Sequence, residues 1–199
     1  MFTGIIQALG RLDSLNRKDF SELTVRLEPP AAIRIGDSVA VDGACLTVAR
    51  MDGDRYTFHL SKETLALSRF ADLGKGSVLN IELPLRMKDF LGGHLVSGHL
   101  DGTVRARAVR RGSGAATFSF TYTDAAWRRY LVHKGSVCLN GISLTLTQVQ
   151  ASSFSVETIP HTLQTTNLKH LRVGERVNVE LDLIAKYLYN LQVRKTDDT

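Results

Sequence analysis

The chain has 199 residues, of which 43% are hydrophobic, and it carries a formal net charge of +5. That apolar content supports folded cores and excludes an intrinsically disordered protein. The opening residues lack the features of a signal peptide, and no apolar run is long enough to span a bilayer. We therefore expect a soluble, cytoplasmic protein with no membrane partner. The basic residues are scattered instead of forming a dense stripe with aromatic residues, so we expect no nucleic-acid partner.

In chain order, the sequence predicts an all-β protein. Strands are indicated where apolar and polar residues alternate and the run ends in turn residues. The clearest runs are residues 23–27, 38–41, 46–50, 56–60 and 78–83, then 116–122, 137–139, 142–149, 154–158 and 176–181. Many short strands with few helices predict a small closed barrel in each half of the chain.

Turns and short helices separate these strands. Asp42-Gly43 and Asn140-Gly141 each join two runs and favour type I′ hairpin turns, which need positive φ at both positions. Residues 63–65 and 161–163 each open a short helical segment. Asp124 can cap a further helix over residues 125–131.

The last predicted element is an amphipathic helix with no counterpart earlier in the chain. Ile184, Tyr187, Leu188 and Leu191 recur at helical spacing, with polar residues on the other side. Such a helix either packs on its own barrels or pairs with other subunits. We favour oligomerisation.

The chain contains two copies of one module. Residues 39–48 read Val-Ala-Val-Asp-Gly-Ala-Cys-Leu-Thr-Val, and residues 137–146 read Val-Cys-Leu-Asn-Gly-Ile-Ser-Leu-Thr-Leu. Their offset is 98 residues (Gly141 minus Gly43), and the same offset carries residues 80–83 onto 178–181. An internal repeat decides the architecture, and two related pockets suit a protein that handles two copies of one molecule.

One strand of each copy presents small polar side chains away from the core. Side chains two residues apart share a face in a strand, so Ser143 and Thr145 point together. Cys45 and Thr47 occupy the matching places in the first copy. A polar strand face is often only water-facing, but its recurrence in both copies indicates a site in each.

The two copies differ in their titratable groups. The repeat pairs Cys45 with Ser143 and Pro84 with Asp182. At the start of each copy, residues 2–5 align with residues 96–99, which pairs Ile5 with His99. The second copy therefore gains an imidazole and a carboxylate, and the first keeps a thiol. These groups can transfer protons or act as nucleophiles, so the pockets could hold one ligand in two chemical roles.

No metal site or disulfide is predicted. His94 and His99 are five residues apart, which places them on opposite faces of an extended strand, and we see no ligand set to complete a zinc site. Cys45 and Cys138 hold non-equivalent positions, so we expect free thiols. We expect Cys138 to pack as a small apolar side chain.

Several segments together resemble one family. They are Met-Phe-Thr-Gly-Ile-Ile at 1–6, Asp-Gly-Ala-Cys-Leu-Thr-Val at 42–48, Gly-Gly-His-Leu-Val-Ser-Gly-His-Leu-Asp-Gly at 92–102, Lys-Gly-Ser at 134–136, Gly-Ile-Ser-Leu-Thr at 141–145, and Ile-Pro-His-Thr-Leu at 159–163. In this order, over residues 1–190, the chain resembles the trimeric, alpha-chain type of riboflavin synthase. The motifs are specific in combination.

The resemblance implies two tandem six-stranded Greek-key barrels, at 1–93 and 94–183, each binding lumazine, and a trimerisation helix with a tail at 184–199. It implies that two molecules of 6,7-dimethyl-8-ribityllumazine per active site exchange a four-carbon unit. The products are riboflavin and 5-amino-6-ribitylamino-2,4-pyrimidinedione, and no cofactor or metal is used. It also implies a homotrimer with active sites between the N-terminal barrel of one subunit and the C-terminal barrel of the next. Association with lumazine synthase stays open.

Carried over by position, the resemblance places two lumazine sites. One consists of Gly4, Ile5, Ile6, Ser143, Leu144, Thr145, Glu157, Thr158, Ile159, Pro160, His161 and Thr162. The other consists of Cys45, Leu46, Thr47, His59, Leu60, Ser61, Lys62, Glu63, Thr64, Gly98, His99, Leu100 and Lys134.

We expect catalytic roles for Cys45, His99, Ser143 and Asp182. The 7-methyl group of the substrate is acidic, so the protein has to stack two ring systems in opposed orientation and move protons. His99 and Ser143 are expected to assist proton transfer, and Asp182 to accept a proton or orient a group. Cys45 either attacks ring carbon 7 or positions a water or ribityl hydroxyl there.

One alternative keeps the same fold. Non-catalytic lumazine- or flavin-binding fluorescent proteins hold a chromophore without turnover, but they lose motifs around the second pocket. All four expected catalytic residues are present here, so we favour the enzyme. A pair of oligonucleotide-binding barrels is disfavoured by the aromatic content of only 7%.

Overall fold

The first copy of the module closes into a barrel of six antiparallel strands. The computed structural model describes residues 1–17, 21–28, 33–112 and 115–197, with side chains as far as Val193. The strands are β1 (Ala8–Asn16), β2 (Ser21–Leu27), β3 (Ser38–Val41), β4 (Ala44–Asp52), β5 (Arg55–Leu60) and β6 (Val78–Glu82). They follow the order β1-β2-β5-β4-β3-β6, and β6 pairs with β1 to close the barrel.

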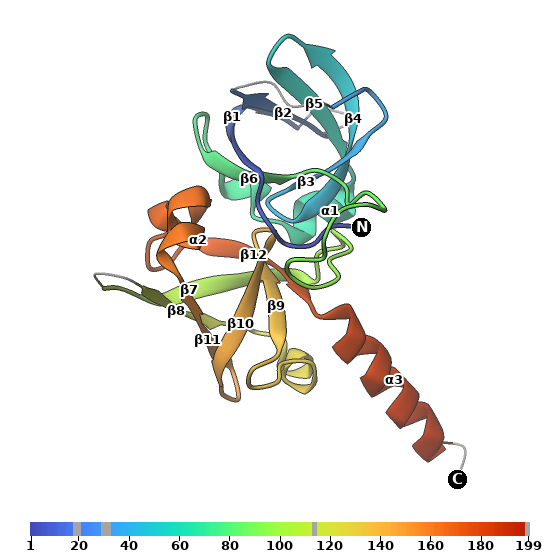
Figure 1. Cartoon of the computed structure of the whole chain (residues 1–199), viewed down its shortest axis with the longest axis vertical. Helices are drawn as coiled ribbons and strands as arrows, with labels where there is room; N and C mark the ends of the chain where they lie inside the picture. Colours follow the sequence, from blue (N-terminus) through green and yellow to red (C-terminus); the bar gives the residue numbers. More distant parts are fainter. Residues whose placement is uncertain (18–20, 29–32, 113–114, 198–199) are drawn as a thin grey trace.

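The second copy repeats this arrangement below the first (Figure 1). Its strands are β7 (Gly102–Arg111), β8 (Ala116–Thr121), β9 (Ser136–Leu139), β10 (Ile142–Val149), β11 (Ser153–Thr158) and β12 (Arg176–Leu181). The order β7-β8-β11-β10-β9-β12 matches that of the first barrel strand for strand. The predicted all-β fold with two tandem six-stranded barrels is therefore confirmed.

Alternation along the site strands is as predicted. In β10, Ile142, Leu144 and Leu146 are buried in the barrel core, whereas Ser143 and Thr145 are half-buried and exposed. β4 shows the same pattern from Ala44 to Val48. The polar face of each strand therefore points out of its barrel.

Two strands were missing from the sequence prediction. β1 and β7 each open a barrel, and their inward positions include the small residues Gly10 and Ala106. Arginines fill outward positions of β7, so its apolar alternation is weak. Pairing with β6 and with β12 supplies the hydrogen bonds that define these strands in the fold.

Short helices connect the strands. They are α1 (Lys62–Leu67), η1 (Phe70–Asp72), η2 (Ala125–Arg129), α2 (Pro160–Thr165) and η3 (Asn167–His170), where η marks a 3₁₀ turn. The helix expected over residues 125–131 is thus a shorter 3₁₀ turn, although Asp124 caps it by accepting from the Ala126 backbone N at 2.8 Å. Tyr130 N donates to Trp127 O and closes this turn early with an i→i+3 bond.

The two predicted hairpin turns meet where the barrels join. Asp42 and Gly43 have φ of +44° and +82°, and Asn140 and Gly141 have +46° and +79°, which confirms positive φ at all four. A Cβ added at Gly43 would lie 2.7 Å from the backbone N of Gly141. Only glycine allows the turns to contact each other so closely.

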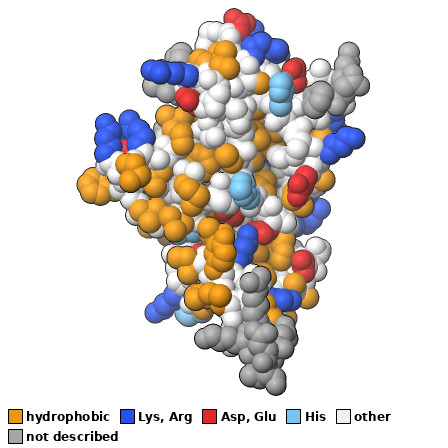
Figure 2. Space-filling view, turned by 90° about the vertical axis from the view of Figure 1, so that its right-hand side faces the viewer, with side chains coloured by type: hydrophobic (Ala, Val, Ile, Leu, Met, Phe, Trp, Pro, Cys, Tyr) orange, Lys and Arg blue, Asp and Glu red, His pale blue; other side chains and the backbone are white. Residues whose placement is uncertain are grey.

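α3 (Leu183–Asp197) extends away from both barrels (Figure 1). Its apolar residues Ile184, Tyr187, Leu188 and Leu191 are 53–63% exposed in the single chain. Figure 2 shows hydrophobic side chains gathered over the middle of the face that carries this helix. Within the described residues, no helix is both long and apolar enough to cross a membrane.

Candidate functional site

The first barrel has a cavity on the face of β4 that carries Cys45. Its volume is about 350 Å³, and it is lined by Ala44, Cys45, Glu63, Thr64, Leu67, Gly98, His99 and Leu100. Gly98, His99 and Leu100 belong to the segment between β6 and β7, so the first barrel does not build this cavity alone. The thiol of Cys45 and the imidazole of His99, which the repeat assigned to different copies, line the same cavity.

Gly98 lets this segment lie directly on β4. Its carbonyl accepts a hydrogen bond from Cys45 N at 2.9 Å, and its φ is +84°. A Cβ at this position would lie 2.5 Å from the Cβ of Cys45. A side chain at position 98 would therefore push the His99 segment off the barrel.

The second barrel is approached in the same way by the start of the chain. The Gly4 carbonyl accepts from Ser143 N at 2.8 Å, and Gly4 has a φ of +78°. A Cβ at Gly4 would lie 2.6 Å from the Cβ of Ser143. Ile5 follows and is 47% exposed beside this contact. Each barrel's polar strand face is thus completed by a segment from the other repeat.

His94 is a site residue that the sequence analysis missed. Its Nδ1 lies 2.7 Å from Ser143 Oγ, and its backbone N donates to Thr3 O at 3.1 Å. Burial lowers the pKa of His94, and the nearby Asp182 carboxylate partly offsets this. The alignment of the copies gave no signal for His94, because His94 precedes the aligned start of the second copy and has no counterpart in the first.

Gly93 makes the approach of His94 possible. A Cβ there would lie 2.1 Å from Thr3 O and 2.8 Å from the Cβ of Ser143. Gly93 therefore brings the imidazole of His94 to Ser143.

Asp182 holds the start of α3 beside this second site. Its Oδ1 accepts from Ile184 N at 2.9 Å, and its backbone O accepts from Lys186 N at 3.1 Å. Asp182 therefore combines a capping role with an electrostatic effect on His94.

Two buried carboxylates fix the segments that complete the sites. Glu82 Oε1 accepts from Thr3 N at 2.6 Å and from Thr3 Oγ1 at 2.7 Å, and its Oε2 accepts from Gly4 N at 3.0 Å. Glu180 makes the equivalent bonds to Ser97 N and Oγ, both at 2.7 Å, and to Gly98 N at 2.9 Å. Burial raises the pKa of Glu82, while the bonds from Thr3 and Gly4 act against that shift.

The helical parts of the predicted sites lie next to the strand faces. Ser61 Oγ accepts from Thr64 N at 3.0 Å and so starts α1, which brings Glu63 and Thr64 to the cavity. Ile159 is the N-cap residue of α2, and Pro160 fits its first turn. The equivalent helices therefore flank equivalent strands.

Other predicted residues take different places. Leu46, Leu60 and Leu144 are 4–6% exposed and point into the barrel cores, so only their backbones can face a ligand. Thr158 is buried and donates to Ala116 O at 3.3 Å. His59 is exposed, with Nε2 at 3.5 Å from Glu22 Oε1.

The exposed Lys134 lies on the second barrel, with its backbone N donating to Leu146 O, and is not among the residues that line the cavity beside Cys45. The single chain therefore does not bring Lys134 together with the rest of its predicted site.

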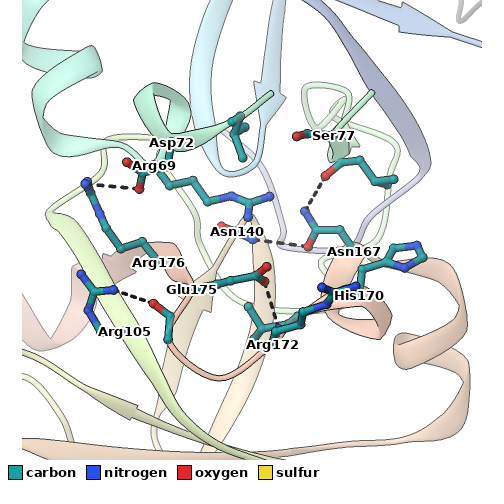
Figure 3. A pocket seen from close by; sticks show the side chains of 14 residues that line it. Arg69, Asp72, Ser77, Arg105, Asn140, Asn167, His170, Arg172, Glu175 and Arg176 are labelled. Atoms are coloured by element: carbon teal, nitrogen blue, oxygen red, sulfur yellow. Dashed lines mark hydrogen bonds and ion pairs between the residues drawn. The ribbon is translucent and has the colours of Figure 1, made fainter. Parts of the chain in front are cut away.

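A larger cavity of about 610 Å³ lies between the barrels (Figure 3). Its side chains pair within the protein: Arg69 Nη2 is 2.8 Å from Asp42 Oδ2, and Arg176 Nη1 is 3.3 Å from Asp72 Oδ2. None of the sequence-predicted site residues lines it. We therefore regard it as the joint between the repeats and assign it no substrate.

Metal ligands do not gather in either site. Among the described residues, no three His, Cys, Asp or Glu side chains lie close enough together to hold an ion. Cys45 is a half-buried free thiol, and Cys138 is free and 1% exposed, as predicted. Burial raises the pKa of the Cys138 thiol well above its usual range, so Cys138 is an inert packing residue.

Comparison with known proteins agrees with this geometry. A family model described as the lumazine binding domain matches residues 3–84 and again residues 97–182. Riboflavin synthase of Bacillus subtilis (strain 168) is 35% identical over 191 residues, which cover 95% of this chain and 88% of that protein. The chain belongs to the riboflavin synthase family.

Other members of the riboflavin synthase family match to a similar extent. The enzyme of Actinobacillus pleuropneumoniae is 33% identical over 100% of this chain and 93% of its own length. That of Escherichia coli (strain K12) is 36% identical over 92% of this chain and 87% of its own. The repeat seen in the sequence therefore corresponds to two lumazine binding domains.

Solved structures share the fold at lower identity. A crystal structure of LumP complexed with 6,7-dimethyl-8-(1′-D-ribityl) lumazine has a TM-score of 0.82 at 21% identity, covering 91% of this chain and 99% of that one. LumP complexed with riboflavin gives 0.83 at 22%. At this identity the likeness supports the double-barrel fold alone.

Proposed function

We propose that this chain catalyses the riboflavin synthase reaction. Two molecules of 6,7-dimethyl-8-ribityllumazine bind with opposed orientation, and one transfers a four-carbon unit to the other. The products are riboflavin and 5-amino-6-ribitylamino-2,4-pyrimidinedione. The two products together contain the atoms of the two substrates, so the reaction needs no added oxidant or reductant.

The observation that supports this proposal is the pairing of related sites with different chemistry. Both barrels present a small polar side chain at the same place of the same strand, Cys45 on β4 and Ser143 on β10. His99 lines the cavity beside Cys45, and the imidazole of His94 lies within hydrogen-bond distance of the Ser143 hydroxyl. A protein that only stores one chromophore does not need two such sites.

In the second site, Ser143 and His94 are suited to move a proton. The 2.7 Å separation of Ser143 Oγ and His94 Nδ1 is a hydrogen-bond distance. Because burial lowers the pKa of His94, its imidazole is neutral at neutral pH and can accept a proton from the serine or the substrate methyl group. Asp182 stabilises the imidazolium that then forms.

In the first site, Cys45 and His99 are placed to act on the second lumazine. Cys45 either attacks ring carbon 7 or positions a water or ribityl hydroxyl at that carbon. His99 is exposed at the cavity and has its backbone N fixed by Ser97 Oγ at 3.1 Å. The enzyme's main contribution is to hold two rings in register, since proximity alone can lower a barrier by up to roughly 7–11 kcal/mol.

The two sites must meet between subunits for this reaction. We propose a cytoplasmic homotrimer held by α3, in which the N-terminal barrel of one subunit faces the C-terminal barrel of the next. The exposed apolar residues of α3 support an oligomer. The exposed Met87 and Phe90, in the segment between the barrels, add to the apolar surface available for it. Lys134, placed on the second barrel, would then reach the neighbouring subunit's Cys45 site.

A single incubation tests the activity. Purified protein mixed with 6,7-dimethyl-8-ribityllumazine alone is expected to generate riboflavin, detected by its fluorescence and by chromatography, with one pyrimidinedione formed per riboflavin. If a stable lumazine complex forms without product, the activity proposal is wrong. The chain is then the alternative, a non-catalytic lumazine- or flavin-binding protein. The shared fold with LumP keeps that alternative in view.

A further inference from the structure

Residues 3–4 and 97–98 each complete the site of one barrel, and each segment is held by a carboxylate from the other barrel. Glu82 ends β6 in the first barrel, and Glu180 lies in β12 of the second; both are 2% exposed. Glu82 binds residues 3–4, which lie on Ser143 of the second barrel. Glu180 binds residues 97–98, which lie on Cys45 of the first.

The carboxylates reach beyond the residues they bind directly. Thr3 Oγ1 donates to Glu82 and accepts from Ile5 N at 3.3 Å, and Ser97 Oγ donates to Glu180 and accepts from His99 N at 3.1 Å. A hydroxyl between the carboxylate and the next backbone N–H therefore sets the position of Ile5 in one segment and His99 in the other. Bonds to a charged acceptor are stronger than neutral ones.

The packing makes these segments sensitive to small displacements. Gly4 and Gly98 approach Ser143 and Cys45 so closely that a Cβ would be 2.6 and 2.5 Å from theirs. A segment released by its carboxylate cannot move closer to the strand, so it moves away and opens the site. Loss of the carboxylate therefore widens the site of the opposite barrel while the barrel that carries it keeps its own strand pairing.

We infer that Glu82 and Glu180 are crossed positioning residues: Glu180 of the second barrel sets the geometry of the Cys45 site, and Glu82 of the first sets that of the Ser143 site. This inference rests on the proposed function, in that both sites bind 6,7-dimethyl-8-ribityllumazine. Neither carboxylate touches the substrate. Each acts through the segment that it holds.

The test compares Glu180→Gln and Glu82→Gln in the full-length chain. A glutamine keeps the shape but replaces one acceptor oxygen with an NH₂ group, which leaves a backbone N–H without an acceptor. Lumazine stoichiometry is measured by calorimetry. Occupancy of the first site is measured separately, as protection of the half-buried Cys45 from iodoacetamide; Cys138 is too buried to react. Glu28→Gln, on the surface, is the matched control.

Wild type and Glu28→Gln are expected to bind two lumazines per chain and to protect Cys45. Glu180→Gln should need at least about tenfold more lumazine to protect Cys45, and Glu82→Gln should leave that protection unchanged while losing the other binding event. A purely structural role would weaken both events equally in either variant. Equal weakening, unchanged binding, or loss in the barrel that carries the mutation would each overturn the inference.

Folding failure does not block the test. Ser97→Ala removes the hydroxyl between Glu180 and the next N–H, and Thr3→Val replaces the corresponding hydroxyl at Glu82 by a methyl group of similar size. Both variants should reproduce the same crossed pattern with smaller shifts. If wild-type protein binds no lumazine at all, the proposed function fails instead, and the two failures are thereby distinguished.

Discussion

The two barrels share strand order and register but differ in how their sites are closed. In the first, Cys45 faces an open cavity of about 350 Å³ with His99 at its edge. In the second, His94 from the segment between the barrels lies on the hydroxyl of Ser143. The two copies therefore share one scaffold, and a few residue differences give each site a different set of titratable groups.

The same contrast appears at the joint. The second copy uses Asn140 and Asn167, where the first has Asp42 and Arg69. Asp42 is fully buried, and burial raises its pKa, while Arg69 is the main opposing influence. One copy thus carries a buried ion pair where its twin carries neutral amides. We expect the largest loss of stability from variants of this Asp42–Arg69 pair.

Arg69→Ala is expected to reduce the free energy of unfolding by about 3–5 kcal/mol, because it leaves the Asp42 carboxylate buried without its partner. Removing Arg69 also raises the pKa of Asp42 further, so part of the loss should be recovered as the pH is lowered and Asp42 becomes neutral. Urea unfolding at several pH values measures both effects.

The matched variant is Asp42→Asn with Arg69→Asn, which gives the first copy the amides of the second. It should lie much closer to wild type than Arg69→Ala. If the double variant is as unstable as the single one, the ion pair is not the source of the effect.

The next largest effect is expected in the segment at residues 97–98, which completes the Cys45 site. Gly98→Ala introduces a Cβ 2.5 Å from that of Cys45 at a φ of +84°, and should cost about 2–4 kcal/mol of stability as well as lumazine binding at the first site. Gly53→Ala has a φ of +60° but no atom within 4 Å of the new Cβ, so it should cost only about 1 kcal/mol. If both variants lose the same free energy of unfolding in urea, then backbone strain, and not the close contact with Cys45, causes the loss.

These two sites show what the sequence can and cannot predict. Repeat spacing and alternation predicted the barrels, the paired turns, and the outward faces that carry Cys45 and Ser143. They did not predict which pocket His99 enters, because a residue aligned in one repeat can complete the other; only the family resemblance grouped His99 with Cys45. His94 was missed for another reason: it precedes the aligned part of the second copy, and its contact with Ser143 forms only in the folded chain.

His94→Gln is expected to lower turnover about a hundredfold, the size typical of losing a general acid or base. Glutamine keeps a polar contact to Ser143 but cannot take up a proton, so lumazine affinity should change little. His170→Gln, at an exposed histidine of the joint cavity, is the control and should retain wild-type turnover. If His94→Gln keeps wild-type turnover, His94 does not transfer a proton, and that step falls to His99 and the substrate.

Cys45→Ser should have a smaller effect, about tenfold on turnover with lumazine binding preserved. Serine keeps a hydroxyl that can still position a water or ribityl group, but it is a poorer nucleophile than the thiol. Steady-state rates and calorimetric binding separate the two possibilities. An unchanged rate would eliminate a catalytic thiol at Cys45.

The smallest expected effect is on the pH dependence of the second site. Burial lowers the pKa of His94, so the unfolded chain binds a proton there more readily than the folded one. Stability from neutral His94 is therefore fully present above the unfolded-state pKa of about 6.5, and is lost as the pH falls below it. His94→Gln should lose this part of the acid dependence in urea unfolding.

Asp182 opposes the shift, so Asp182→Asn, which retains a capping oxygen for Ile184, should move the acid inflection of turnover to lower pH. A shift to higher pH would mean that the Asp182 charge does not act on His94.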